Sequence, residues 1–170
     1  MKKRIASLLL ILCMTLTLLP TTVLADDGST GAATQNEACI GETPYATLAE
    51  AVNAAQDKQT VKLLRDVTLN QTVRIGKSIT IDGNGCNVTS NGTPAVMFQI
   101  TGNSELNPVM IQNCTFVTPD SSEGNNTWVA IYVQNRVKNL TIKNNTFEIK
   151  ALNKSNTFQC IGLAADNSDN

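Results

Sequence analysis

The sequence repeats a pattern of strand, polar corner and strand at nearly constant spacing, and this repeat restricts the fold more than any other feature. Three copies of the pattern occupy residues 78–88, 108–117 and 139–149. The matched residues Ile81, Ile111 and Ile142 are 30 and 31 residues apart. Periods of about 20 to 50 residues are typical of stacked repeats.

Apolar and polar residues alternate in each copy, which places one side of each strand in a core and the other in water. A third apolar run follows each copy, at residues 96–100, 129–133 and 159–163. Matching Val133 with Leu163 again gives a spacing of 30 residues. The sequence therefore predicts coils of three strands, starting with a first coil at residues 61–75 and ending near residue 163.

The corners of the repeat are rich in asparagine. Asn113 and Asn144 occupy matched corners, where asparagine tolerates a left-handed backbone and its amide can bond neighbouring main chain. Stacking of the copies predicts that these two side chains lie against each other as a structural ladder. Gly83 stands at the matched position upstream, so the ladder should end there.

The runs LTIKNNTFEI and ITIDGNG resemble those of right-handed parallel β-helix proteins of the pectate lyase-like superfamily, and the resemblance covers roughly residues 40–165. It implies an all-β fold, a right-handed parallel β-helix of about four coils with a short N-terminal capping α-helix. The superfamily includes polysaccharide lyases, glycoside hydrolases, adhesins and surface proteins, so the fold does not choose among these functions.

The N-terminus has the pattern of a bacterial secretory signal peptide over residues 1–25, with a basic start, an apolar run and a small-residue cleavage site. A membrane anchor is the alternative, but Thr15, Thr17 and Pro20 interrupt the apolar run. The sequence thus predicts a secreted or cell-surface protein with no membrane span after cleavage. A flexible leader should cover residues 26–37, and the β-helix domain residues 38–170.

Residues 46–56 are predicted to form an amphipathic helix. Leu48, Ala51, Val52 and Ala55 fall on one face, and Thr47 with Glu50 forms a capping-box pattern. A lone helix of this length needs a docking surface. We expect it to cover the N-terminal end of the β-helix, where backbone groups would otherwise be unpaired.

The charge balance argues against nucleic acid as a partner. Removing the three signal-peptide cations from 13 positive and 14 negative residues leaves a formal net charge of −4. The chain has no histidine, which excludes imidazole metal sites and histidine-dependent triads. No cofactor is predicted.

No catalytic or metal-binding residue is predicted. Asp82 and Lys143 are expected on one face, two coils apart, where lyases of the superfamily hold calcium and a base. One carboxylate cannot supply the six to eight or so oxygen ligands of a calcium site. No two carboxylates match in neighbouring coils, as a glycoside hydrolase would need.

Trp128 and Tyr132 are the candidate carbohydrate-binding residues, because aromatic side chains beside polar turns can stack on sugar rings. The alternative is that Trp128 packs under the preceding loop and Tyr132 covers a neighbouring coil. The leading hypothesis is a non-catalytic module for adhesion or contact with a polysaccharide or a host or cell-surface glycan. The alternative is a polysaccharide lyase or glycoside hydrolase, or a piece of one.

Four cysteines remain after signal cleavage, with three possible pairings: Cys39, Cys86, Cys114 and Cys160. The repeat alignment places Cys86 with Phe116 and Phe147 in the core, and Cys114 with Asn84 and Asn145 in the corner. A disulfide between Cys86 and Cys114 would then fail on direction. Four unpaired thiols remain the alternative.

The C-terminal coil is predicted to be uncapped. Ile161 and Leu163 should point inward, and only a short polar tail follows. An open coil exposes apolar side chains and unpaired backbone groups. The sequence therefore predicts either a fragment whose longer relatives continue with more coils, or end-to-end self-association.

Overall fold

The computed structural model describes residues 35–90, 95–102, 108–118, 127–134, 137–150 and 157–164. The chain divides into two units, residues 1–33 and 34–170, and every described residue belongs to the second. The predicted signal peptide, most of the leader and the C-terminal tail lie outside the described residues. Within the described residues, no helix is long and apolar enough to cross a membrane.

The described residues of the second unit form β-strands and one short helix, α2 (Leu48–Ala54). Its strands are β1 (Ala38–Ile40), β2 (Thr43–Tyr45), β3 (Thr60–Leu63), β4 (Val67–Leu69), β5 (Val73–Ile75), β6 (Thr80–Asp82), β7 (Asn87–Ser90), β8 (Val96–Ile100), β9 (Val109–Gln112), β10 (Thr115–Val117), β11 (Thr127–Val133), β12 (Leu140–Lys143), β13 (Thr146–Glu148) and β14 (Thr157–Leu163).

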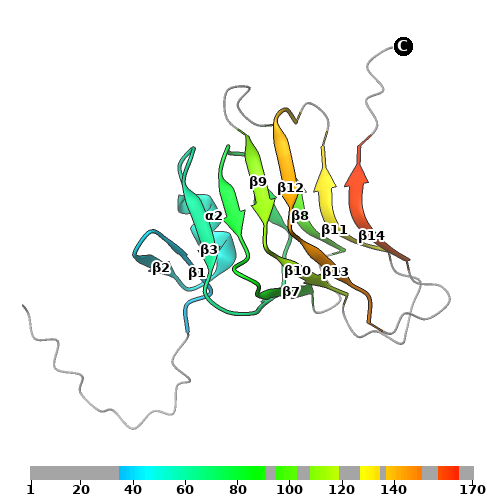
Figure 1. Cartoon of the computed structure of the whole chain (residues 1–170), viewed down its shortest axis with the longest axis horizontal. Helices are drawn as coiled ribbons and strands as arrows, with labels where there is room; N and C mark the ends of the chain where they lie inside the picture. The colour runs from blue at the N-terminus through cyan, green and yellow to red at the C-terminus, as the bar shows by residue number, and fades with distance from the viewer. Residues whose placement is uncertain are drawn as a thin grey trace, which may run out of the picture. The chain divides into compact units, whose positions relative to one another are not determined.

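The described strands form three sheets in which, among β3 to β14, strands three apart in the chain are neighbours. Sheet A has the order β12-β9-β6-β3-β1-β2, sheet B the order β13-β10-β7-β4 and sheet C the order β14-β11-β8-β5. All pairs from β3 onward are parallel. Figure 1 shows β1, β2 and α2 at one end of these sheets, and β12, β13 and β14 toward the other. Stacked parallel sheets of this kind are consistent with a β-helix.

The register confirms the period of the repeat. Ile81 pairs with Ile111, and Ile111 pairs with Ile142. Val133 pairs with Leu163, as the spacing of the third strands predicted. A coil is defined here as three successive strands, one in each sheet, so that β3 begins the first coil and β12 the fourth.

Inward side chains of matched strands build the core. Ile81, Val109 and Ile111 of sheet A are buried, and so is Ile79 just before β6. Phe116 of sheet B lies between two other rings, edge-to-face with Phe98 at 5.2 Å between ring centroids and stacked with Phe147 at 5.4 Å. The core thus continues from coil to coil, since matched positions supply apolar side chains at one strand spacing.

Helix α2 lies against strands β1, β2, β3 and β5 and buries Leu48, Ala51 and Val52. Thr47 is its N-cap, and the capping box with Glu50 is present as predicted. The helix is shorter than the predicted range 46–56, because Ala55 has an extended ψ of 144°. The Nζ of Lys77 closes this end by donating to the carbonyl oxygens of Asn53 at 2.6 Å and Ala55 at 2.7 Å.

The strands β1 and β2 form a hairpin that the repeat did not predict in this position. They pair antiparallel with each other, and β1 pairs antiparallel with β3. Sheet A therefore changes from parallel to antiparallel pairing at its N-terminal end.

The corner between sheets A and B differs in length from coil to coil, and this corrects the cysteine alignment. Four residues, 83–86, form it in the second coil, and two residues, 113–114, form it in the third. Asn84 and Gly85 account for the difference, with φ of 53° and 80° as in a type I′ turn. Val88 rather than Cys86 pairs with Phe116, so the predicted match of Cys86 with Phe116 is wrong.

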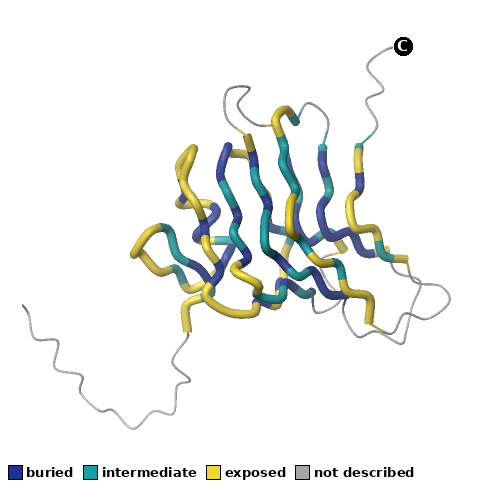
Figure 2. Tube along the Cα trace, in the orientation of Figure 1, coloured by how far each residue is buried: buried dark blue, intermediate teal, exposed yellow. Residues whose placement is uncertain are grey.

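The inward residues of the fourth coil are less covered than those of the third. Ile161 is 44% and Leu163 is 74% exposed, whereas their partners Ile131 and Val133 are 0% and 9% exposed. Figure 2 shows the change from buried segments in the middle strands to exposed and half-buried segments in β12, β13 and β14. Self-association through this edge stays a prediction.

Candidate functional site

The outward face of sheet A carries a row of polar side chains. Lys62 pairs with Asp82, Asp82 pairs with Gln112, and Gln112 pairs with Lys143. Asp82 and Lys143 therefore lie on one face, two coils apart, as the sequence predicted.

Asp82 is held by three donors from its own turn and the next coil. The backbone N–H of Asn84 donates to Oδ1 at 3.0 Å, Nε2 of Gln112 to Oδ2 at 3.2 Å, and Nδ2 of Asn113 to Oδ1 at 3.0 Å. Burial raises the pKa of Asp82, but the hydrogen bonds from Asn113, Asn84 and Gln112, with the charge of Lys62, outweigh it and lower the pKa below its ordinary value. This carboxylate joins two coils.

Two other carboxylates, those of Glu37 and Glu50, lie beside α2. Glu37 Oε2 accepts from the N–H of Leu48 at 2.9 Å, and Glu50 Oε2 accepts from the N–H of Thr47 at 3.3 Å. Both line a cavity of about 260 Å³ between α2 and the β4–β5 corner. Each carboxylate satisfies an N–H at the start of the helix, which is the ordinary role of acidic residues there. Among the described residues, no group of acidic or cysteine side chains could hold a metal ion.

The corner asparagines have the predicted backbone but different side-chain partners. Asn113 and Asn144 have φ of 56° and 55°. The predicted ladder between their side chains is wrong, because Asn113 donates to Asp82 in the preceding coil. Asn145 instead bonds across the coils: its Oδ1 accepts from the N–H of Cys114 at 2.9 Å, and its Nδ2 donates to the carbonyl oxygen of Ile111 at 2.9 Å.

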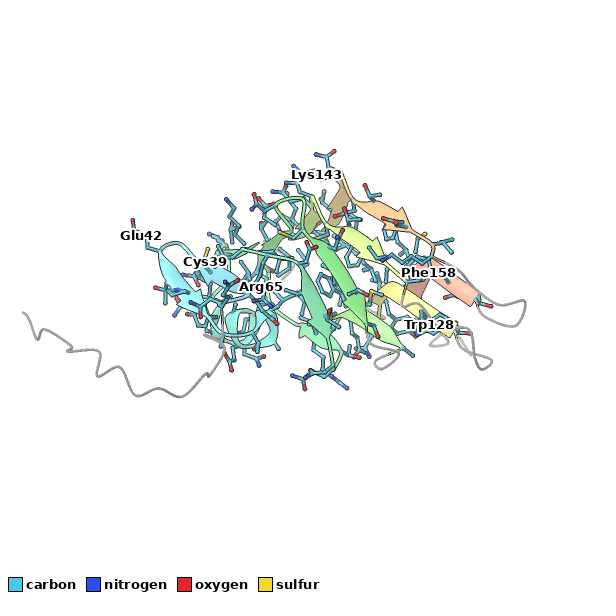
Figure 3. The ribbon with its side chains drawn as sticks, turned by 90° about the horizontal axis from the view of Figure 1, so that it is seen from below. Cys39, Glu42, Arg65, Trp128, Lys143 and Phe158 are labelled. Atoms are coloured by element: carbon cyan, nitrogen blue, oxygen red, sulfur yellow. The ribbon has the colours of Figure 1, made fainter. Side chains whose placement is uncertain are left out.

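Trp128 does not offer an open ring. It is 1% exposed and pairs in register with Phe158 of the next coil. Figure 3 shows Trp128 and Phe158 at the same end of neighbouring strands. A buried indole presents no open ring face to a sugar in this conformation, and carbohydrate contact by Trp128 stays a prediction.

Tyr132 lies on the outward face of sheet C. Its chain neighbours Ile131 and Val133 belong to the core, so the alternation of the strand turns the tyrosine outward, where it is half-buried. It pairs with Gln99 of the preceding coil and with Gly162 of the following coil.

The ring of Tyr132 lies against Gly162, which has no side chain to keep it away. A Cβ at Gly162 would lie 3.0 Å from Cδ2 of Tyr132, 3.1 Å from Cγ1 of Val129 and 3.3 Å from Oε1 of Gln159. These atoms converge on one outward spot of sheet C. The Tyr132 patch comprises Gln99, Val129, Tyr132, Gln159 and Gly162.

The Tyr132 patch combines an aromatic ring with two primary amides, and the Val129 side chain is buried beside them. Each amide supplies donors and an acceptor, and the tyrosine adds a hydroxyl. The sequence singled out Tyr132 alone, and it missed Gln99, Gln159 and Gly162. The 30-residue spacing of Tyr132 and Gly162 was the signal that could have placed them together.

Comparison of the chain with protein-family models, with curated proteins and with solved structures finds no match. The fold and the surface therefore define the class of protein on their own: in the described residues, stacked parallel sheets with one short helix and an aromatic–amide patch on an outward sheet face.

Proposed function

We propose that the chain is a non-catalytic module of a secreted or cell-surface protein that contacts carbohydrate through the Tyr132 patch. The observation that carries this proposal is the Tyr132 ring lying over Gly162, with Gln99 one coil before it and Gln159 beside it. The C–H face of a sugar ring packs on aromatic and aliphatic carbon, while its hydroxyls exchange hydrogen bonds with amides.

The proposed architecture is a right-handed parallel β-helix of the pectate lyase-like kind. Parallel strands that return to the same sheet, with coils of three strands and asparagine corners, support it. The handedness rests on the strong preference of parallel crossover connections for the right-handed sense.

A rigid backing under the ring favours binding. Gly162 is buried beneath the ring, and the register ties Tyr132 to strands on both sides. A ring fixed before the ligand arrives loses less rotational freedom on binding than a free surface tyrosine would. The patch is therefore suited to weak, repeated contacts along a polymer of sugar units.

A glycan array probed with the labelled full chain tests the proposal. Tyr132→Ala should weaken binding to the recognised glycans about tenfold, about 1.4 kcal/mol, whereas Tyr132→Phe should retain most of it because the ring remains. Tyr45→Ala, in β2 at the opposite end of the sheets, is the matched control and should bind like the wild type. Unchanged binding by a folded Tyr132→Ala variant would remove the Tyr132 patch from consideration.

A separate assay tests the alternative that the chain is an enzyme acting on polysaccharides. It would use the outward row of sheet A, where Asp82 and Lys143 lie two coils apart. Incubation of the chain with acidic and neutral polysaccharides, with and without calcium, should release no unsaturated or reducing sugar ends. Release of such ends that Asp82→Asn abolishes would replace the non-catalytic proposal with the enzyme.

A further inference from the structure

Cys86 and Cys114 occupy the same place in consecutive coils. Each immediately precedes the first residue of a strand of sheet B, and those two residues, Asn87 and Thr115, pair with each other. The N–H of Thr115 donates to the carbonyl oxygen of Cys86 at 3.1 Å, and the N–H of Thr146 donates to that of Cys114 at 2.9 Å. The two cysteines are thus neighbours across one parallel ladder.

Their backbone separation suits a disulfide. Neighbouring strands lie about 4.8 Å apart, and disulfides join residues whose Cα atoms are about 4.4 to 6.8 Å apart. The misfit inferred from the sequence depended on placing Cys86 level with Phe116, and the register removes that argument.

The sulfur of Cys114 also extends toward the second coil. A Cβ built on Gly83 would lie 2.6 Å from this Sγ, so the sulfur reaches into the corner of the second coil. That corner is the turn in which the N–H of Cys86 donates to the carbonyl oxygen of Gly83 at 2.8 Å. The thiol of Cys114 therefore lies against the turn that carries Cys86.

The remaining cysteines cannot compete for either partner. Cys39 belongs to β1, near the N-terminal edge of sheet A, with β3 between it and the second coil. Cys160 is exposed in β14, at the C-terminal edge of sheet C. These two strands lie at opposite ends of the stack, which also prevents a bond between Cys39 and Cys160.

The two thiols differ in accessibility. Burial raises the pKa of Cys114 to about 12, with further contributions from the charges of Asp82 and Cys86. Burial, followed by the charge of Asp66, also raises the pKa of Cys86, but this residue is only half-buried. Cys86 is consequently the thiol that an external reagent reaches first.

We propose that Cys86 and Cys114 form a disulfide that ties the second coil to the third when the chain meets a disulfide donor such as oxidised glutathione. The thiolate of Cys86 attacks the donor and releases one glutathione thiolate, and Cys114 then displaces the second. The two protein thiols lose two protons and two electrons, and the donor becomes two thiols. The bond closes residues 87–113 into a loop that contains β7, β8 and β9.

Peptide mapping of the full chain tests this inference. The chain is oxidised with glutathione disulfide, denatured, alkylated without reduction and digested with trypsin. Both cysteines fall in one peptide, residues 78–136, because no lysine or arginine lies between Lys77 and Arg136. The expected peptide carries no alkyl group and is lighter by two hydrogens than the reduced peptide, while Cys39 and Cys160 are alkylated or carry glutathione.

Thermal unfolding gives a second readout. Oxidation should raise the unfolding midpoint of the wild type by several degrees, and a reductant should reverse the rise. Cys86→Ser should abolish the rise, whereas Cys160→Ser, the matched control, should preserve it. If Cys86→Ser does not fold, the mass of the wild-type peptide 78–136 is the deciding measurement. Alkylation or glutathionylation of Cys86 and Cys114 without an internal bond, or a bond from either to Cys39 or Cys160, would overturn the inference.

Discussion

Nδ2 of Asn113 donates a 3.0 Å hydrogen bond to Oδ1 of Asp82, which links the corner of the third coil to the last residue of β6 in the second. Gln112 donates to the other oxygen of the same carboxylate. One side chain thus holds two successive residues of the next coil. The row on sheet A is therefore part of what keeps the coils in register.

The Asp82 link should make stability depend on pH in acid. The folded-state pKa is lowered from 3.8, so ionised Asp82 stabilises the fold above that value, and its contribution is lost as pH falls through the lower folded pKa. Asp82→Asn should lose about 1 kcal/mol at neutral pH, and its denaturant midpoint should vary less below about pH 4 than that of the wild type. If the denaturant midpoints of the two proteins change equally with pH in acid, Asp82 is not the group whose titration affects stability.

Gly83 should tolerate no side chain. A Cβ there would lie 2.5 Å from the carbonyl oxygen of Asn113 and 2.6 Å from Cα of Cys114, and both obstacles are backbone atoms. Gly83→Ala should cost about 1–3 kcal/mol or more. Gly102→Ala is the control, because no atom of the described residues lies within 4 Å of a Cβ at that position. Similar urea midpoints for the two variants would contradict the close stacking of the second and third corners.

Asn145 and Asn144 are adjacent, but they should contribute differently to the free energy of unfolding. Asn145→Ala removes two bonds to backbone groups of the third coil and should cost about 1–3 kcal/mol. Asn144→Gly keeps the left-handed backbone, with φ near 55°, and should change the unfolding free energy by about 0.5 kcal/mol or less. A greater loss of unfolding free energy in Asn144→Gly than in Asn145→Ala would support the asparagine ladder that the sequence predicted.

Removing the phenylalanine ring at the outer end of the stack should lower the free energy of unfolding less than removing the ring in its middle. Phe116 is 0% exposed and contacts a ring on each side, so Phe116→Ala should cost about 3–5 kcal/mol. Phe147 in the fourth coil is half-buried, and Phe147→Ala should cost clearly less. Urea unfolding with unchanged m-values measures both. Equal losses would mean that the fourth coil is packed as well as the third.

The period of the apolar residues was sufficient to predict the parallel strands of the coils and their neighbours. Ile81, Ile111 and Ile142 pair as their spacing required, because inward positions of a parallel ladder repeat once per coil. Thr47 and Glu50 likewise predicted the start of the helix, since a capping box is a local interaction. These features depend on residues close in sequence or on a strict repeat.

The corners could not be predicted at the level of single residues. The additional Asn84-Gly85 turn shifts Cys86 away from Phe116, although the spacing from Ile81 to Ile111 is that of an undisturbed repeat. Whether Asn144 or Asn145 bonds the preceding coil depends on which of two identical residues takes the left-handed backbone. Burial of Trp128 agrees with the packed alternative that the sequence offered, but periodicity did not distinguish it from an exposed ring.

A titration followed by ¹H–¹⁵N NMR tests the carbohydrate proposal most directly, using the glycan that gives the strongest array signal. If the Tyr132 patch binds the glycan, the backbone amides of Gln99, Tyr132 and Gly162 and the side-chain amides of Gln99 and Gln159 should shift progressively. No such shifts should occur in Tyr132→Ala. Shifts confined to the cavity beside α2, at residues such as Thr47, Asn53 and Gln71, or to the outward row of sheet A, would contradict the proposal.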